Sequence, residues 1–342
     1  MRSTLKDIAH ALGVSTTTVS WVLSGQSRKK GISQATEELV MKCAQELNYQ
    51  PNLLARSLQG GASGTIGLVV PSIGDLFYSS LARAMEAEAE KLGYTLMVCS
   101  SESDGARESR MIDVLRAKQV DGILMAPLKL SNARIISMLE DRFPFVLVDR
   151  YYPELQTNYV IFDNEDSSFK LVSHLISKGY RKIAVVTTNS YLYSMTMRHK
   201  GYVEAHRAAG LEPDPELYGE VKYHNYVMGS QQELISVLDT ILERRPDVEA
   251  FFFTTHVLTS LLFTYCSMRN IKPDDFGIAS IHEEPFYTML APRINVAMIP
   301  IAPMGYEAVR ILQREIRATE SKKTFKGSKT GLTLSCNVIF RE

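Results

Sequence analysis

Cysteine and histidine are the residues that could give this chain metal or redox chemistry. Four cysteines occur, at Cys43, Cys99, Cys266 and Cys336. They lie far apart and form no CxxC pair, which disfavours both a zinc site and a disulfide framework. His256 and His282 each follow a short apolar run, but no third ligand stands at a matching position. We therefore expect no bound metal.

A glycine-rich stretch at residues 60–67, GGASGTIG, raises the question of phosphate binding. In nucleotide-binding motifs the glycines follow a strand and open a helix, whereas here they precede the apolar run TIGLVV. The chain also contains no GK[ST] sequence. We therefore expect no cofactor, neither a nicotinamide nor ATP, and we assign no catalytic residue.

Three consecutive basic residues, Arg28, Lys29 and Lys30, lie in the stretch GQSRKKGIS. They belong to a basic first segment, because residues 1–60 carry seven Lys/Arg and four Asp/Glu, a net charge of +3 against −3 in the remainder. A basic segment is compatible with nucleic-acid binding. Three charges alone are equally compatible with a solvated polar face.

The positions of these residues depend on how the 342 residues divide into domains. That length predicts two or three domains. No apolar stretch approaches the roughly 20 residues needed to cross a bilayer. The first residues, MRSTLKDIAHALG, lack an uninterrupted apolar core, so we expect no secretory signal, no membrane partner and a cytoplasmic location.

After residue 64, short apolar runs alternate with longer amphipathic stretches. The runs are TIGLVV, YTLMVCS, DGILMAP, FPFVLVD, KIAVVTT, AFFFTT, FGIASI and INVAMIP. This alternation is typical of βαβ units around a parallel sheet. Because these strands are too many for one comfortable sheet, the sequence predicts an α/β body of two doubly wound parallel-sheet subdomains.

The first 50 residues show helical periodicity instead. Thr4 and Asp7 have the spacing of a capping box, and Gly13 supplies a turn that ends the helix. A later helix opens at Ser33 and carries an apolar face formed by Leu39, Val40, Cys43 and Leu47. Together with a short helix between them these form a helix-turn-helix module. Spacing alone is as compatible with a generic helical hairpin as with DNA binding.

The stretch between them, STTTVSWVLSG at residues 15–25, favours a strand by composition because it holds three consecutive threonines. Helical spacing, however, places Val19, Val22 and Leu23 on one face that matches the first helix, and Ser15 can cap it. We therefore predict a helix with Trp21, the only tryptophan of the chain, on the opposite face.

These motifs closely resemble those of a known family. TLKDIAHALGVSTTTVSWVLSG, followed by ELNYQPNLLARSLQGG, is similar to the DNA-binding head and hinge of the lactose/galactose repressor (LacI) family. The body also contains segments that resemble those of the family and follow each other in the family's order: IGLVVP, VDGILMAP, VLVDRYY, FDNEDSSFKLVSHLISKGYRKIAVV and RHKGY. The resemblance implies a sequence-specific transcriptional regulator, expected to be a repressor. Its fold would be an all-α helix-turn-helix head on a periplasmic-binding-protein-like body.

The DNA contacts that this resemblance implies divide by role. In the major groove, base edges would be read by Thr16, Thr17 and Trp21. Phosphates would be contacted by Thr4, Ser15, Ser20 and Arg28. The hinge would contribute Tyr49, Asn52, Ala55 and Leu58. In the family the hinge helix folds only on the operator, where Leu58 would wedge into a base step of the minor groove.

Two features of the head depart from the common pattern of the family. At the reading positions the family most often has arginine where this chain has Trp21, and a larger or more polar residue where it has Thr16 and Thr17. A bidentate arginine–guanine contact would therefore be replaced by threonine methyl contacts, the indole N–H and stacking. The loop around Arg28 is also longer than in the lactose repressor. Both features resemble the fructose- and sucrose-responsive branch of the family.

The resemblance also implies an effector site between the two α/β subdomains, at the carboxyl ends of strands. Family positions that line this cleft are matched by Asp75, Phe77, Tyr78, Asp149, Arg150 and Arg198. Asp149 would accept hydrogen bonds from sugar hydroxyls, and Arg198 would hold a hydroxyl, carboxylate or phosphate. His256 and His282 are either sugar contacts or partly exposed structural histidines. The expected effector is a small sugar or sugar phosphate.

The expected domains are a DNA-binding domain at 1–50, a hinge helix and linker at 51–64, and an effector-binding and dimerisation domain at 65–342. In the last, one subdomain would comprise about 65–162 and 294–322, and the other about 163–293 and 323–342. Expected partners are palindromic operator DNA, the effector, and a second copy in a homodimer, with a tetramer as the alternative.

Two other functions are left open by the sequence. A sugar-binding protein without a DNA role would leave residues 1–60 unexplained. A sugar-processing enzyme would need a nucleophile with a base beside it, which the cleft candidates do not supply.

Overall fold

The computed structural model describes residues 3–49, 62–128, 132–222, 229–320 and 329–341. The chain forms two compact units, Met1–Ser63 and Gly64–Glu342. Within the described residues, no helix is both long enough and apolar enough to cross a membrane.

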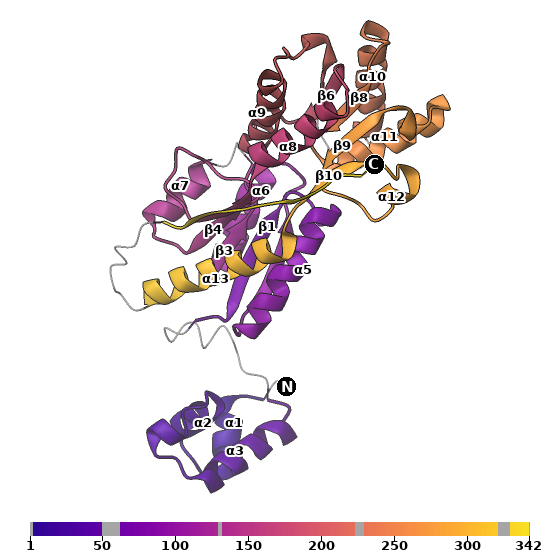
Figure 1. Cartoon of the computed structure of the whole chain (residues 1–342). Helices are drawn as coiled ribbons and strands as arrows, with labels where there is room; N and C mark the ends of the chain where they lie inside the picture. Colours follow the sequence, from indigo (N-terminus) through magenta and orange to yellow (C-terminus); the bar gives the residue numbers. More distant parts are fainter. Residues whose placement is uncertain (1–2, 50–61, 129–131, 223–228, 321–328, 342) are drawn as a thin grey trace. The chain divides into compact units, whose positions relative to one another are not determined.

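The first unit is helical. Along residues 3–49 it contains α1 (Leu5–Leu12), α2 (Thr16–Leu23), the 3-10 helix η1 (Arg28–Lys30) and α3 (Gln34–Glu46) (Figure 1). The Thr4 amide donates to Asp7 Oδ2 over 2.7 Å at the start of α1, and Ser33 Oγ accepts from the Thr36 amide over 3.2 Å at the start of α3. Gly13 ends α1 with a φ of 65°, in the left-handed region that favours glycine. The predicted helix-turn-helix module is confirmed.

The core of this unit differs in part from the predicted one. Its buried side chains are Ile8, Ala9, Val19, Val22, Val40, Cys43 and Ala44. On α3, Val40 and Cys43 are buried as predicted, but Leu39 and Leu47 are 58% and 37% exposed. The predicted apolar face of α3 is thus too wide, because α1 and α2 cover only one narrow stripe of that helix.

The second unit contains two six-stranded sheets. The strands of the first are β1 (Thr65–Val70), β2 (Thr95–Ser100), β3 (Gly122–Met125), β4 (Phe145–Val148), β5 (Tyr159–Phe162) and β11 (Gly331–Leu334). They pair in the order β11-β5-β4-β3-β1-β2, and every pairing is parallel. One face packs against α5 (Leu76–Lys91) and α13 (Ile301–Glu320). The other packs against α6 (Gly105–Ala117) and α7 (Asn132–Glu140).

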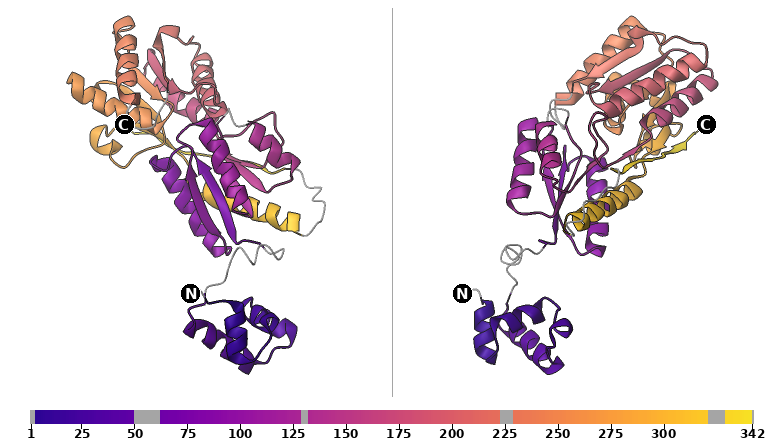
Figure 2. Two further views of the ribbon diagram at one scale, coloured as in Figure 1. Left: turned by 180° about the vertical axis from the view of Figure 1, so that it is seen from behind. Right: turned by 90° about the vertical axis from the view of Figure 1, so that its left-hand side faces the viewer.

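The second sheet has the order β12-β10-β9-β8-β6-β7. Its strands are β6 (Ile183–Thr188), β7 (Tyr218–Val221), β8 (Ala250–Phe253), β9 (Gly277–Ile281), β10 (Asn295–Met298) and β12 (Asn337–Ile339). Helices α8 (Asn164–Ser177) and α9 (Tyr193–Ala208) cover one face. Helices α10 (Gly229–Arg244) and α11 (His256–Arg269) cover the other (Figure 2). The short elements η3 (Pro215–Leu217), η4 (Pro273–Asp275) and α12 (Tyr287–Leu290) lie in its connections. The predicted pair of doubly wound subdomains is confirmed.

The chain passes between the two sheets after β5, after β10 and again between β11 and β12. The expected subdomain boundaries at 294 and 323 are therefore wrong. Strand β10 pairs with β9 in the second sheet, and β11 pairs with β5 in the first. Strands β11 and β12 are short and half-exposed, and their partners lie far away in the sequence, so periodicity did not reveal them.

Helices α8 and α9 approach each other closely at Gly201. A Cβ at this position would lie 2.3 Å from the carbonyl oxygen of Glu165 and 2.8 Å from the Cβ of Ser168. The absence of a side chain at Gly201 therefore sets the distance between the two helices and fixes α9 against the sheet.

Candidate functional site

The outward face of α2 is the candidate DNA-reading surface. Ser15 Oγ accepts a hydrogen bond from the Thr18 amide over 3.0 Å, so it caps the helix as predicted. Val19 and Val22 are buried in the head, whereas Thr16 and Thr17 are exposed. The strand that the composition favours does not form, because the helix cap and the buried valines outweigh the low helix propensity of threonine.

Trp21 lies beside the basic element η1. The Lys30 ammonium is 5.1 Å from the centre of the indole ring, a cation–π contact. Trp21 is half-buried, as is Ser20, and Arg28, Lys29 and Lys30 are exposed. The contact therefore joins the face of α2 to a surface of positive charge.

The other predicted DNA contacts have varied surroundings. Thr4 Oγ1 donates to Asp7 Oδ2 over 2.8 Å, and hydrogen bonds from the Thr4 amide and hydroxyl lower the pKa of Asp7. The hydroxyls of Thr4 and Ser15 thus serve helix caps. Tyr49 packs half-buried against the head core. Asn52, Ala55 and Leu58 lie outside the described residues.

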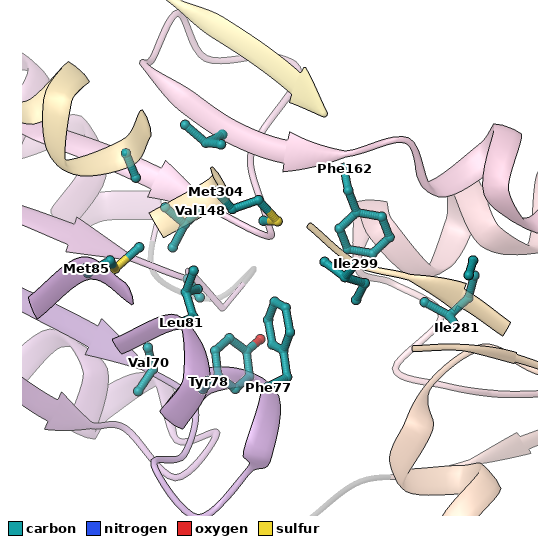
Figure 3. Close-up of a cluster of buried hydrophobic side chains, with 14 of the residues drawn as sticks. Val70, Phe77, Tyr78, Leu81, Met85, Val148, Phe162, Ile281, Ile299 and Met304 are labelled. Carbon is teal, nitrogen blue, oxygen red and sulfur yellow. The ribbon is translucent and has the colours of Figure 1, made fainter. Parts of the chain in front are cut away.

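A cavity of about 50 Å³ lies between the two subdomains of the body. Seven of the eight side chains predicted for the effector site line it: Asp75, Phe77, Tyr78, Asp149, Arg150, Arg198 and His256. Figure 3 shows Phe77 and Tyr78, near the start of α5, opposite Phe162 and Ile299, which lie where the chain crosses between the sheets. Asp75 and Asp149 come from the first subdomain and Arg198 and His256 from the second, so both subdomains contribute to this inner cavity.

The first subdomain contributes two carboxylates to the inner cavity. Asp75 is the N-cap of α5, and its Oδ1 accepts from the Phe77 amide over 2.8 Å. Asp149 directly follows β4 with a φ of 61°, and its Oδ2 accepts from the Tyr78 hydroxyl over 2.8 Å. The Nε of Arg150 lies 3.5 Å from the same oxygen. Left-handed backbone at a non-glycine residue is strained, and such strain is concentrated at binding sites.

The second subdomain contributes Arg198, which is only 4% exposed. Its Nε donates to Asn164 Oδ1 over 2.8 Å and its Nη1 donates to the Thr254 carbonyl over 2.6 Å. Burial lowers the pKa of this guanidinium, and the charge of Asp149 partly offsets that effect. Because both partners are neutral, no direct ion pair with them cancels the positive charge of Arg198 at the cavity.

His256 links the two subdomains. Its Nε2 lies 3.3 Å from Asp75 Oδ1 in the first subdomain and 3.5 Å from Glu284 Oε1 in the second. Burial raises the pKa of Glu284, and the attraction of His256 partly offsets this. An acid, a histidine and a second acid thus meet across the cleft, where a ligand could strengthen or displace them.

His282 is the exception among the eight predicted residues, because its side chain does not line the inner cavity. Its ring centre lies 5.7 Å from that of His256 and 6.3 Å from that of Phe77. Its Nδ1 accepts a hydrogen bond from the Ile299 amide over 3.4 Å. Burial, helped by the nearby charges of His256 and Arg198, lowers the pKa of His282 to about 4. The structural alternative therefore describes His282 better than a sugar contact.

This environment predicts that the protein loses stability in mild acid. Because the pKa of His282 is lowered in the folded state, the unfolded state binds the proton more tightly than the folded state does. Protonation therefore favours unfolding once the pH falls below about 6.5. The free energy of unfolding should fall by about 2–3 kcal/mol from this residue as the pH drops from 6.5 to 4. Urea unfolding at successive pH values should show a flatter dependence for His282→Asn. His10→Asn, at an exposed position of α1, should leave the dependence unchanged, and identical curves for wild type and His282→Asn would contradict the assignment.

Sequence reasoning missed several residues of the inner cavity. These are Thr188, Asn189, Leu192, Met195, Thr255, Val257, Ile281 and Ile299. Thr188 ends β6 and Ile281 ends β9, so the rule that ligands bind at the carboxyl ends of strands could have identified both. Glu284 gave no comparable signal, since it lies in a loop beyond β9.

The described residues contain no group of three or more histidine, cysteine, aspartate or glutamate side chains that could hold a metal ion. The cysteines are free thiols. Burial raises the pKa of Cys266 to about 11 and that of Cys336 to about 12. These thiols are therefore protonated near neutral pH and are poor nucleophiles.

Comparisons with known proteins match both units. Residues 4–52 match the model for bacterial regulatory proteins of the lacI family, and residues 63–255 match that for periplasmic binding proteins and the sugar-binding domain of the LacI family. The HTH-type transcriptional regulator DegA of Bacillus subtilis (strain 168) is 30% identical, over 94% of each chain.

Solved structures agree with the fold. A lac repressor dimer bound to operator and the anti-inducer ONPF gives a TM-score of 0.80 at 21% identity, covering 100% of this chain and 98% of that one. A complex of the regulator CelR with cellobiose gives 0.71 at 24% identity, covering 100% and 99%.

Proposed function

Since this chain belongs to the LacI family of bacterial regulatory proteins, we propose that it is a repressor that binds a near-palindromic operator as a homodimer. Membership makes the chain a DNA-binding transcriptional regulator controlled by a sugar rather than an enzyme. The observation that carries the proposal is the inner cavity, where charged side chains of both subdomains converge.

The cavity can couple ligand to operator because it is shared between the subdomains. Asp75 and Asp149 lie on one side, and Arg198 and His256 on the other. A sugar that bonds to both sides favours one arrangement of the two subdomains and shifts the equilibrium toward it. The coupling is reciprocal, so operator changes sugar affinity by the same factor that sugar changes operator affinity. For an inducer, occupancy lowers operator affinity.

In the head, Thr16, Thr17 and Trp21 would read base edges from α2, with Thr4, Ser15, Ser20 and Arg28 on phosphates. The exposure of Thr16 and Thr17 and the position of Trp21 beside η1 support this. The hinge that begins after Tyr49 would lie in the minor groove, where Asn52 and Ala55 would contact the DNA and Leu58 would wedge into a base step. One head covers a half-site, so two copies are needed for a palindrome.

The finer parts of the proposal concern effector and location. The tryptophan at position 21 and the long basic loop favour fructose, its phosphates or sucrose as effectors. The protein would act in the cytoplasm, where operator DNA is accessible, as a dimer or as a tetramer of two dimers. Domain roles follow the expected division, with residues 1–50 as reader, 51–64 as hinge and the rest as effector-binding body.

Selection of binding sequences from a random duplex library tests the proposal. Full-length protein should enrich a near-palindrome, and its affinity should fall about 1,000-fold or more between 50 and 200 mM salt, as expected for several phosphate contacts. A fragment of residues 64–342 should keep a cooperative unfolding transition and lose operator binding. Specific binding by this fragment would contradict the proposal.

Trp21 allows a direct check of the reading face. Trp21 is the only tryptophan of the chain, so tryptophan fluorescence reports on it alone. The emission should change when the selected operator is added, because DNA contact alters the surroundings of the indole. Trp21→Ala should lower operator affinity about tenfold, equivalent to about 1.4 kcal/mol. Trp21→Phe separates loss of the indole N–H from loss of the ring. Unchanged emission on a saturated operator would place Trp21 away from the DNA.

A further inference from the structure

A second cavity, of about 240 Å³, adjoins the inner one. The two share Arg150 and Leu192, so the second, outer cavity continues the site. Like the inner cavity, it is lined from both subdomains. Residues that follow β4 contribute Tyr151 and Pro153, and the start of α9 with the loop before it contributes Tyr191 and Tyr193.

The two cavities differ in chemistry. The inner one presents two aspartates, two arginines and a histidine. In the outer one the tyrosine rings dominate, and the charged lining residues are a single carboxylate, Glu154, and the shared Arg150. An anionic group would find one cation and one anion there, which gives no net attraction. Aromatic faces instead suit an uncharged ligand with an apolar face.

Two of the tyrosines, Tyr151 and Tyr193, are held in place by ring contacts. Tyr151 stacks on Tyr159 at a ring distance of 4.2 Å and meets Tyr193 edge to face at 4.9 Å. Tyr191, by contrast, is 48% exposed, so its ring is available to a ligand. A rigid aromatic wall with one accessible ring suits the C–H face of a pyranose or furanose, which packs on aromatic faces while its hydroxyls stay in water.

The volume of the two cavities also favours a ligand larger than one sugar ring. Small-molecule sites typically measure about 300–1,000 Å³, and the inner cavity alone holds about 50 Å³. The outer cavity, at about 240 Å³, brings the whole site close to that range. A ligand confined to the inner cavity would leave most of the available volume empty.

We propose that the effector is a disaccharide or larger glycoside, with one ring hydrogen-bonded by the charged groups of the inner cavity and the next stacked on the tyrosines of the outer cavity. This inference rests on the proposed function, because it assumes that a sugar binds the inner cavity. It adds that specificity for chain length lies in Tyr151, Tyr191 and Tyr193. A second ring would also contact both subdomains, so it would strengthen the coupling to the hinge.

The test is calorimetric titration of the full-length protein with hexoses and the disaccharides that contain them: glucose with cellobiose and maltose, galactose with lactose and melibiose, and fructose with sucrose. Fructose phosphates are titrated in the same series. One disaccharide should bind at least tenfold more tightly than either of its hexoses. Tyr191→Ala should lower this ratio of affinities about tenfold, and Tyr191→Phe, which keeps the ring, should preserve it. A structural role for Tyr191 would instead weaken hexose and disaccharide equally.

The outcomes separate the two proposals. If a hexose binds as tightly as every disaccharide that contains it and Tyr191→Ala leaves the ratio unchanged, the outer subsite is wrong and the sugar-controlled site stands. If a fructose phosphate binds more tightly than any disaccharide, the disaccharide proposal is wrong and the sugar-phosphate effector of the proposed function stands. If none of these sugars binds, the proposed effector class fails and the outer subsite fails with it.

Discussion

Replacing Arg198 with alanine is expected to abolish the response of operator binding to sugar. This arginine lies at the inner cavity with a charge that its Asn164 and Thr254 partners do not neutralise. A hydrogen bond from a charged donor contributes about 1.5–3 kcal/mol, so sugar affinity should fall about 100-fold. The measurement is the thermal shift with fructose, fructose phosphates, sucrose and other sugars, followed by operator titration with the best of them.

The control for Arg198→Ala is Arg207→Ala on the same helix. Arg207 is exposed and pairs with Glu204 over 3.5 Å, so its loss should change neither sugar affinity nor operator binding. Removing a buried arginine also leaves two acceptors unpaired, so the unfolding temperature of each variant must be measured. A folded Arg198→Ala protein that still releases operator on addition of the best sugar would show that the inner cavity is not the effector site.

Replacing Gly201 with alanine is expected to destabilise the body by about 1–3 kcal/mol. Helix propensity alone predicts the opposite sign, because alanine is favoured over glycine by about 1 kcal/mol within a helix. Here the contact decides, since the new Cβ would lie 2.3 Å from the Glu165 carbonyl oxygen. Helices α8 and α9 would have to separate. Arg198 lies almost one turn earlier on α9, so sugar affinity should fall as well.

Urea unfolding followed by far-UV circular dichroism measures this effect. Gly74→Ala is the matched control, because the nearest atom to its Cβ would be Ser72 Oγ at 3.5 Å, an ordinary contact. It should change the free energy of unfolding by less than about 0.5 kcal/mol. Equal stability of Gly201→Ala and wild type would mean that the two helices are not held by this contact.

The sequence predicted seven of the fifteen residues that line the inner cavity, because simple rules position those seven. An apolar run ends and a polar residue follows, as at Asp149 and Arg150 after β4, and the carboxyl ends of parallel strands meet at one edge. The same rules could not show that His256 reaches Asp75 across the cleft. That contact depends on how the subdomains close together, and no local pattern encodes it.

The aromatic residues of the outer cavity were also missed, for a related reason. Tyr151 and Tyr191 lie in connections between regular elements and Tyr193 is the first residue of α9, so helical or strand periodicity carries no information about any of them. Tyr151 could be aligned with the cleft because it follows Arg150, but its partner Tyr193 is more than 40 residues away. Only the crossing of the chain after β5 brings these tyrosines to one wall.

Because the chain crosses between the sheets three times, both sheets are completed only by the last strands to be synthesised. Strand β11 covers β5 in the first sheet, and β12 covers β10 in the second. As the ribosome releases the chain from its first residue onward, the buried strands β5 and β10 are the edge strands of their sheets until residues 331–339 emerge. Unpaired strand edges are templates for aggregation. A premature stop shortly before residue 331 would therefore leave two buried, apolar strands as sheet edges at once, and no complete subdomain.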